Sequence, residues 1–243
     1  MFSHNIVLDD GTHLNADSVT LEQLPQFHAV ARCLKALYPH GFDGVRVADL
    51  ACAEGSYAVG LARMGFEVLG IEIRRANYAT CCFVKQQVNL PNLSFVQDNV
   101  WNLERYAPFD AILCSGILYH LDRPKQFLDL MARCVRKAVL INSHFATVTP
   151  IDAFNLSALT EHEDLPGRWF PEPPPKNEEH LRSSWDNERS FWIQKEFLLQ
   201  AIRDAGFNMV FEQYDWLGDQ IAHSMVAGLY RMRNRNLFVG VKV

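Results

Sequence analysis

The chain has 243 residues, of which 49% are hydrophobic and 21% are charged, and its formal net charge is −5. These values are typical of a soluble globular protein that can bury a core of its own. The acidic balance differs from that of a dedicated nucleic-acid-binding protein, so we expect no nucleic-acid partner. No run of 18 apolar residues is present, and we therefore expect neither a transmembrane helix nor a membrane partner.

The cysteine pattern predicts reduced thiols. None of the six cysteines forms a C-x-x-C pair, and several lie in apolar runs, which argues against both disulfides and a zinc site. We expect no metal ligands. The first residues lack a basic stretch followed by an apolar one, so they do not resemble a signal peptide. Together these features predict a cytoplasmic protein.

Residues 1–44 form a predicted N-terminal extension, with an extended start over 4–8 and a helix over 20–37. The main domain, residues 45–243, then alternates strands and helices. The predicted strands span 45–50, 67–72, 93–96, 109–114 and 138–142, and the predicted helices 57–64, 74–88 and 125–136. This alternation is typical of parallel βαβ units in a doubly wound α/β sheet.

The regular pattern breaks over about 145–190, which is too long for an ordinary connection. The segment is rich in aromatic residues, unlike a disordered linker, so we predict an ordered cap inserted between strand five and the last helix. Trp169, Trp185 and Trp192 could form its core or a wall for a planar ligand. A helix over 194–205 and strands over 207–214 and 237–243 complete a mostly parallel, seven-stranded, Rossmann-like sheet.

The first strand is followed by a loop of small residues. Ligands of open α/β sheets bind beyond the carboxyl ends of the strands, and Ala51, Ala53 and Gly55 would let the backbone approach such a ligand at a helix N-terminus. A dinucleotide-binding loop, G-x-G-x-x-G, would need a glycine where the chain has Ser56. This argues against an oxidoreductase that uses a nicotinamide dinucleotide.

The loop from Asp49 to Gly55 resembles motif I of class I methyltransferases, an acidic residue followed by G-x-G-x-G, with alanines at two glycine positions. Residues 109–121, FDAILCSGILYHL, resemble their fourth motif in the "LYHL" form of the tRNA wobble-uridine methyltransferases. The opening, HNIVLDDG over 4–11, resembles the "H-x-I-x-L-x-D-G" start of the same branch. The resemblance covers roughly residues 4–145. If Ala51 or Ala53, which stand at glycine positions of the motif, must adopt a positive φ, that backbone conformation costs energy.

The resemblance implies S-adenosyl-L-methionine as cofactor and S-adenosyl-L-homocysteine as product. Glu72 ends the second strand, where an acidic side chain can accept hydrogen bonds from ribose hydroxyls. The family places an acidic residue against the adenine amino group, and Asp98 fits that position. The predicted cofactor-binding residues are Asp49, Ala51, Cys52, Ala53, Gly55, Tyr57, Glu72, Ile73, Asp98, Asn99, Cys114 and Ser115.

The acceptor is expected near the ends of strands four and five, under the cap. Methyl transfer chiefly requires that the acceptor be held in line with the methyl group, and a base is needed only if the acceptor must lose a proton. The candidate catalytic residues are His144, His120 and Tyr119, with Asn142 beside them. Either histidine could act as a base, whereas His120 could equally be a packed structural residue.

The sequence therefore favours methyl transfer to a small-molecule acceptor, directed to oxygen or nitrogen. A tRNA-modifying methyltransferase and a degenerate cofactor-binding module without turnover remain as alternatives. The last basic cluster, Arg231, Arg233 and Arg235, is interpreted as a solvated loop before the final strand.

Overall fold

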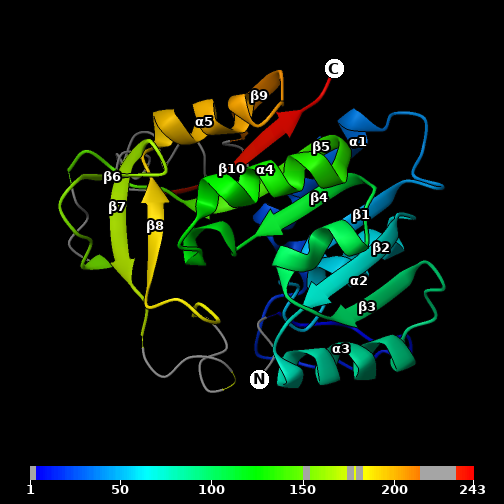
Figure 1. Cartoon of the computed structure of the whole chain (residues 1–243). Helices are drawn as coiled ribbons and strands as arrows, with labels where there is room; N and C mark the ends of the chain where they lie inside the picture. The colour runs from blue at the N-terminus through cyan, green and yellow to red at the C-terminus, as the bar shows by residue number, and fades with distance from the viewer. Residues whose placement is uncertain (1–3, 150–153, 174–177, 179–182, 214–233) are drawn as a thin grey trace, which may run out of the picture.

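A computed structural model describes residues 4–149, 154–173, 178, 183–213 and 234–243 (Figure 1). A seven-stranded sheet with the order β3-β2-β1-β4-β5-β10-β9 forms its centre. Its strands are β1 (Arg46–Leu50), β2 (Glu67–Glu72), β3 (Leu93–Gln97), β4 (Phe109–Ser115), β5 (Val135–His144), β9 (Met209–Gln213) and β10 (Arg235–Val241). The first five pair in parallel, and β10 is antiparallel to both of its neighbours. The predicted fold class is confirmed.

Helices cover both faces of this sheet (Figure 1). They are α1 (Pro25–Leu37), α2 (Ser56–Arg63), α3 (Arg75–Gln87), α4 (Pro124–Cys134) and α5 (Lys195–Asp204), with short 3-10 turns η1 (Leu21–Gln23), η2 (Val100–Arg105) and η3 (Leu118–His120). Side chains alternate across each strand, so Val47 packs with α1 and α2 while Ala48 packs with α4 and α5. Both faces are therefore buried, as the apolar strands of a parallel sheet require.

The structure departs from several predicted boundaries. The predicted helix over 20–37 is a 3-10 turn followed by α1, and the predicted strand over 237–243 begins at Arg235. Strand β5 begins at Val135, so the last two residues of the predicted helix 125–136 belong to the strand, because Val135 already pairs with Phe109 of β4. The predicted extended start forms only isolated bridges, Asn5 with Thr20 and Val7 with His13. This short segment pairs with its own neighbours in the chain and does not join the main sheet.

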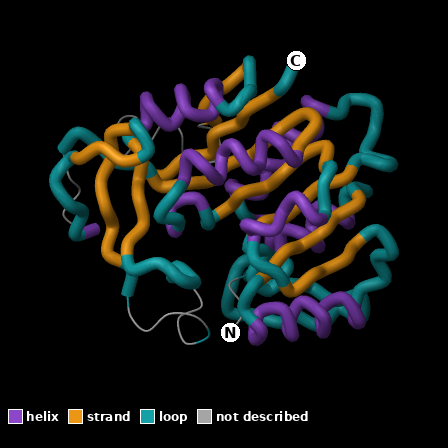
Figure 2. Tube along the Cα trace, viewed as in Figure 1, coloured by secondary structure: helices purple, strands orange, loops and turns teal. Residues whose placement is uncertain are grey.

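The aromatic segment carries a second sheet of three antiparallel strands, which lies beside the main one (Figure 2). Its strands are β6 (Thr160–His162), β7 (Leu165–Pro171) and β8 (Arg189–Ile193), and we call residues 154–193 the cap. Phe191 and Trp192 are only 1% and 2% exposed, and Phe191 joins the core that also contains α4. Trp169 packs partly against the same core. These two tryptophans thus belong to the packed interior of the cap. Trp185 instead lies 5.7 Å from the Arg74 guanidinium.

Candidate functional site

The loop after β1 is built from strained backbone. Ala51 and Ala53 adopt φ values of 52° and 51°, and Gly55, which caps α2, has φ 83°. For an alanine this left-handed conformation costs roughly 1–2 kcal/mol. Glycine at either position would adopt it without this cost. At Gly55 a side chain is excluded, because a Cβ would lie 2.6 Å from the Phe95 ring.

This loop borders a cavity of about 460 Å³ at the carboxyl ends of the strands. The cavity lies where β1 is flanked by β2 on one side and β4 on the other, which is the topological switch point at which α/β sheets bind ligands. Of the residues predicted to bind a cofactor, six line it: Asp49, Ala51, Cys52, Ala53, Tyr57 and Ser115. The sequence thus located the loop side of the cavity.

Two buried oxygen atoms in this cavity have no hydrogen-bond partner within the described residues, Asp49 Oδ2 and Gln26 Oε1. Buried polar atoms are normally paired, so both point to a donor that the described residues do not supply. Burial, with a smaller contribution from Glu72, raises the pKa of Asp49 to about 7, although a bond from the Ala58 backbone N–H works in the opposite direction. A cationic group placed beside Asp49 would restore its charge.

Glu72 lies at the end of β2 and is 2% exposed. Its two carboxylate oxygens accept hydrogen bonds from the backbone N–H groups of Ala53 (2.9 Å) and Arg74 (2.8 Å). Burial nevertheless raises the pKa of Glu72. The Asn77 side chain also donates a hydrogen bond to Glu72, and the carboxylate keeps acceptor capacity for a further donor such as a hydroxyl group. Ile73 follows Glu72 directly, and neither of these two residues lines the cavity.

The Asp98 side chain, directly after β3, is held by residues close to it in the chain. Asp98 accepts hydrogen bonds from the backbone N–H of Asn99 (2.7 Å), from Asn102 Nδ2 (2.6 Å) and from Tyr106 Oη (2.7 Å), and Arg105 lies 3.6 Å away. Burial alone would raise the pKa of Asp98, but these bonds hold it below its ordinary value. The Asn99 side chain accepts from the Trp101 backbone. Contact between Asp98 and an adenine stays a prediction.

Cys114 is fully buried in β4, so only its backbone can face a ligand. Its neighbour Ser115 lines the cavity and lies 3.5 Å from Asn142 Nδ2.

The three candidate catalytic side chains lie together. The ring of Tyr119 lies 4.4 Å from that of His120 and 4.7 Å from that of His144. His144 also stacks on Trp192 at 4.8 Å with an interplanar angle of 10°. Burial and the charge of Arg235 lower the pKa of His144 to about 4. His144 is therefore a neutral, packed ring at physiological pH and a weak base.

Arg235 corrects the interpretation of the last basic cluster. It does not belong to a solvated loop but begins β10, where it pairs with His144 and lines the cavity. Its Nε donates to Asn142 Oδ1 at 3.0 Å, and its guanidinium lies 5.2 Å from the Tyr119 ring. Arg231 and Arg233 lie outside the described residues.

The N-terminal extension supplies another part of the cavity wall that the sequence did not reveal. His4 and Gln26 line it, and His4 Nδ1 is 2.8 Å from Ser56 Oγ. The family-like opening of the chain was noted as a pattern, but its histidine carried no assigned role. The structure brings that histidine to the N-terminus of α2, beside the loop.

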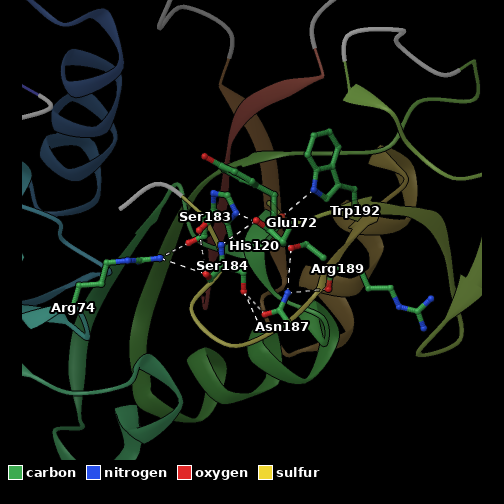
Figure 3. Close-up of polar contacts among 10 residues, drawn as sticks. Arg74, His120, Glu172, Ser183, Ser184, Asn187, Arg189 and Trp192 are labelled. Atoms are coloured by element: carbon green, nitrogen blue, oxygen red, sulfur yellow. Dashed lines mark hydrogen bonds and ion pairs between the residues drawn. The ribbon is translucent and has the colours of Figure 1, made fainter. Parts of the chain in front are cut away.

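A second polar cluster joins the cap to the main sheet (Figure 3). His120 Nδ1 lies 2.8 Å from Glu172 Oε1, and Glu172 also accepts hydrogen bonds from the Ser184 backbone N–H at 3.0 Å and from Ser190 Oγ. On the other side of the cluster, Arg74 Nη2 donates to the Ser183 carbonyl at 2.6 Å. Sequence reasoning missed both Glu172 and Arg74, since no motif links positions so far apart.

A Rossmann-like sheet with a ligand cavity at its switch point, closed by a glycine- and alanine-rich loop, defines a domain that binds a nucleotide-like cofactor. A family model described as "Methyltransferase domain" matches residues 42–185. This is more than half of the chain, and the protein belongs to this methyltransferase family.

Solved structures with the same fold include the N-terminal domain of EvdMO1 with S-adenosylhomocysteine bound. It has a TM-score of 0.67 and 22% identity, and the match covers 91% of this chain and 82% of that one. The 1,6-didemethyltoxoflavin-N1-methyltransferase of Burkholderia thailandensis has a TM-score of 0.57 and 14% identity, covering 91% and 80%.

Among curated proteins, a ubiquinone biosynthesis O-methyltransferase of Acinetobacter baumannii (strain AYE) is 33% identical over 98 residues, which are 40% of this chain and 41% of that protein. The mitochondrial enzyme of the same name from Dictyostelium discoideum is 25% identical over 105 residues, 39% of this chain and 33% of the relative. The chain thus matches between 33% and 41% of the length of these relatives. Within the described residues, no helix is long and apolar enough to cross a membrane.

Proposed function

We propose that the protein transfers a methyl group from S-adenosyl-L-methionine to a small-molecule acceptor and releases S-adenosyl-L-homocysteine. One observation carries the proposal: the switch-point cavity holds a buried carboxylate oxygen, Asp49 Oδ2, without a partner in the described protein. The methionine part of the cofactor carries an ammonium group that fits this oxygen. Gln26 Oε1 offers a second acceptor in the same cavity that has no partner among the described residues.

The remaining cofactor assignments follow the strand ends. The backbone of Ala51–Gly55 and of Cys114–Ser115 would lie against the methionine part, with Cys52 and Tyr57 as walls. Glu72 would hold the ribose, with Ile73 beside it, and the segment Asp98–Asn99 would hold the adenine. When bound, the cofactor supplies an electrophilic methyl group on a sulfonium.

The acceptor would lie on the other side of the cavity, near Tyr119, His120 and His144. The named relatives that support a small-molecule acceptor include O-methyltransferases of ubiquinone biosynthesis and an enzyme bound to 1,6-didemethyltoxoflavin. The tRNA alternative rests on two resemblances, the "LYHL" motif and the opening over residues 4–11, and the chain is acidic. We also propose a cytoplasmic location, because all six cysteines are free thiols.

A thermal-shift titration with S-adenosylmethionine, S-adenosylhomocysteine and NAD tests the cofactor. A ligand at 100 times its Kd stabilises the folded state by about 2.7 kcal/mol, which at this size raises Tm by several degrees. We expect shifts with the two adenosyl compounds only. A shift with NAD alone would overturn the proposal in favour of an oxidoreductase.

The acceptor class is tested with methyl-labelled S-adenosylmethionine and two substrate pools, a small-molecule panel and unfractionated tRNA. Label in small molecules supports the proposal. Label in tRNA that is lost steeply as salt increases would support the tRNA alternative instead. Cofactor binding without any transfer would favour the degenerate module.

A further inference from the structure

Three polar side chains line one end of the cavity, and they come from neighbouring strands. Ser115 ends β4 and pairs with Asn142 of β5. Arg235 begins β10, and because β10 is antiparallel to β5, its first residue lies at the carboxyl end of β5, opposite His144. All three side chains that line the cavity are partly buried. We call Ser115, Asn142 and Arg235 the donor cluster.

Arg235 carries a positive charge that no carboxylate within ion-pair distance neutralises in the described part of the chain. Its Nε donates to Asn142 Oδ1 at 3.0 Å. Burial raises the pKa of Tyr119, whereas the charge of Arg235 and a hydrogen bond from it act in the opposite direction. A guanidinium has five N–H donors, so most of those on Nη1 and Nη2 have no acceptor among the described residues.

The contact with Arg235 also orients the Asn142 side chain. Because Oδ1 accepts from the arginine, the amide nitrogen Nδ2 faces Ser115 Oγ, 3.5 Å away. A hydroxyl oxygen that accepts a hydrogen bond can still donate its own hydrogen. The donor cluster therefore presents N–H and O–H groups to the cavity, while its amide oxygen is already occupied.

The opposite end of the cavity has the reverse character. There Asp49 Oδ2 and Gln26 Oε1 are acceptors without a partner among the described residues. In the proposed function the ammonium group of the cofactor occupies that end, and the sulfonium adds another positive charge. The Arg235 guanidinium in the same cavity repels the sulfonium unless an anion neutralises it. The ligand that completes the cavity is therefore an anion.

We propose that Arg235, with Asn142 and Ser115, binds a carboxylate group of the methyl acceptor, which is therefore an organic acid. The two oxygens of a carboxylate match the parallel N–H groups of a guanidinium. Arg235 is the one lysine or arginine among the described lining residues, and a single cation matches a monoanionic carboxylate better than a dianionic phosphate. Arg235 thus determines specificity. This inference rests on the proposed methyltransferase function.

The methionine part of the cofactor carries a carboxylate of its own, and the strand geometry separates it from Arg235. Asp49 pairs with Leu113 of β4. The Nη2 atom of Arg235 lies 3.7 Å from where a Cβ on Gly116 would be, three residues further along the chain. At about 3.3 Å per residue this is roughly 10 Å beyond the level of Asp49. Because the ammonium and carboxylate of an amino acid share one carbon atom, a methionine part anchored at Asp49 leaves the guanidinium to another ligand.

The first test needs no acceptor and compares S-adenosylhomocysteine with S-adenosylmethionine in calorimetry. Arg235→Gln removes the positive charge and keeps a polar side chain. We expect the affinity for S-adenosylhomocysteine to stay within about threefold and that for S-adenosylmethionine to rise by about three- to tenfold, because the repulsion between two positive charges is lost. A loss shared by both ligands would show that Arg235 binds the methionine carboxylate and would overturn the proposal, as would an unchanged ratio of the two affinities.

The second test supplies the anion. Benzoate and benzamide have nearly the same shape and differ in charge, so both are titrated into protein saturated with S-adenosylhomocysteine, at constant ionic strength and with Tm as the readout. Only benzoate should raise Tm. Arg235→Gln should increase the benzoate concentration needed by about tenfold, as for the loss of a charged hydrogen-bond partner. Equal shifts with both compounds, or an undiminished benzoate shift in the variant, would contradict the proposal.

Two further variants separate recognition from folding. Asn142→Asp places a carboxylate beside Arg235 Nε, so it should keep the contact between the two residues and abolish the benzoate shift. Arg133→Gln removes an exposed arginine that pairs with Glu104 at 2.9 Å, and should leave the benzoate shift unaltered. If Arg133→Gln weakens the shift as much as Arg235→Gln does, benzoate responds to the net charge of the protein and the proposal fails.

Turnover supplies the last test. With methyl-labelled S-adenosylmethionine, organic acids should accept the label and their matched amides should not. Arg235→Lys keeps the charge but loses the paired N–H groups, so it should raise KM for the acid by about tenfold and change kcat less. Label confined to uncharged acceptors would refute the inference. If the native protein binds no adenosyl compound, the proposed function fails, whereas benzoate titration of the ligand-free protein judges the donor cluster separately.

Discussion

The cofactor half of the site and its acceptor half are assembled in different ways. On the cofactor side, the contacts of the strand ends join groups close in sequence: Glu72 binds the Ala53 backbone 19 residues away, and Asp98 binds Asn102 four residues away. The contact between His4 and Ser56, 52 residues apart, is an exception. On the acceptor side, His120 and Glu172 are 52 residues apart, and Arg235 and Asn142 are 93 apart. A motif can encode the first kind of contact, whereas only the folded cap and the last strand create the second.

The difference predicts that the cap can be damaged without loss of the cofactor site. Trp192 is 2% exposed, stacks on His144 and Phe170, and donates from Nε1 to the Tyr119 carbonyl. Trp192→Ala should lower the free energy of unfolding by about 3–5 kcal/mol, measured in urea. The S-adenosylhomocysteine affinity of the folded variant should change less than threefold.

The control for that experiment is Phe83→Ala, because Phe83 lies on α3 and is 46% exposed. It should cost less than about 0.5 kcal/mol. If Trp192→Ala abolishes cofactor binding in protein that is still folded, the cofactor half and the acceptor half form one cooperative unit and are not assembled independently. Arg74 is the residue through which such coupling would pass, since it follows the strand end proposed to bind the ribose and donates to the Ser183 carbonyl.

A substitution at Glu72 tests the cofactor half of the site most directly. Glu72→Ala removes a buried carboxylate expected to accept from the ribose hydroxyls, and should weaken S-adenosylhomocysteine binding by about 1.5–3 kcal/mol. Isothermal titration calorimetry measures the change. Glu67→Ala at the exposed start of the same strand is the matched control and should leave the affinity unaltered. An unchanged affinity for Glu72→Ala would remove that residue from the cofactor site.

Asp49 adds a pH dependence that belongs to the cofactor half alone. Its pKa in the folded protein is about 7, raised from 3.8 mainly by burial. Because the raised value disfavours the carboxylate, its contribution to the stability of the ligand-free protein is full below pH 4 and is lost as pH rises through 7. The cofactor ammonium instead requires the ionised form.

Affinity for S-adenosylhomocysteine should therefore increase as pH rises from 6 to 8, by up to about tenfold. In Asp49→Asn the increase should be absent, and the ligand-free variant should unfold at higher temperature than the native protein at pH 8. Calorimetry at three pH values and a thermal melt test both statements. A slope that persists in the variant would assign the titration to another group.

These contrasts explain what the sequence could predict. The alternation of strands and helices and the residues of the motif loop depend on local patterns, so the sequence predicted most of these elements within a few residues, although β5 and β10 begin at Val135 and Arg235, before the predicted starts at 138 and 237. Strand β7 of the cap was missed because Pro166, Gly167 and Pro171 interrupt its alternation. Glu172 and Arg235 were missed for a different reason: each gains its role from one distant partner, and a single sequence contains no signal for such a pair.

The smallest expected effect lies in the loop itself. Ala53→Gly relieves a left-handed alanine that costs roughly 1–2 kcal/mol, and loses about 0.4–1 kcal/mol because the unfolded chain becomes more flexible. The net gain in the free energy of unfolding should be at most about 1 kcal/mol in urea titrations. Ala58→Gly in the buried interior of α2 is the opposite control and should destabilise the protein, since that position is helical. If Ala53→Gly also destabilises the protein, packing of the Ala53 methyl group outweighs the backbone strain at this residue. The alanines of the loop would then be selected for their contacts and would not be imperfect substitutes for glycine.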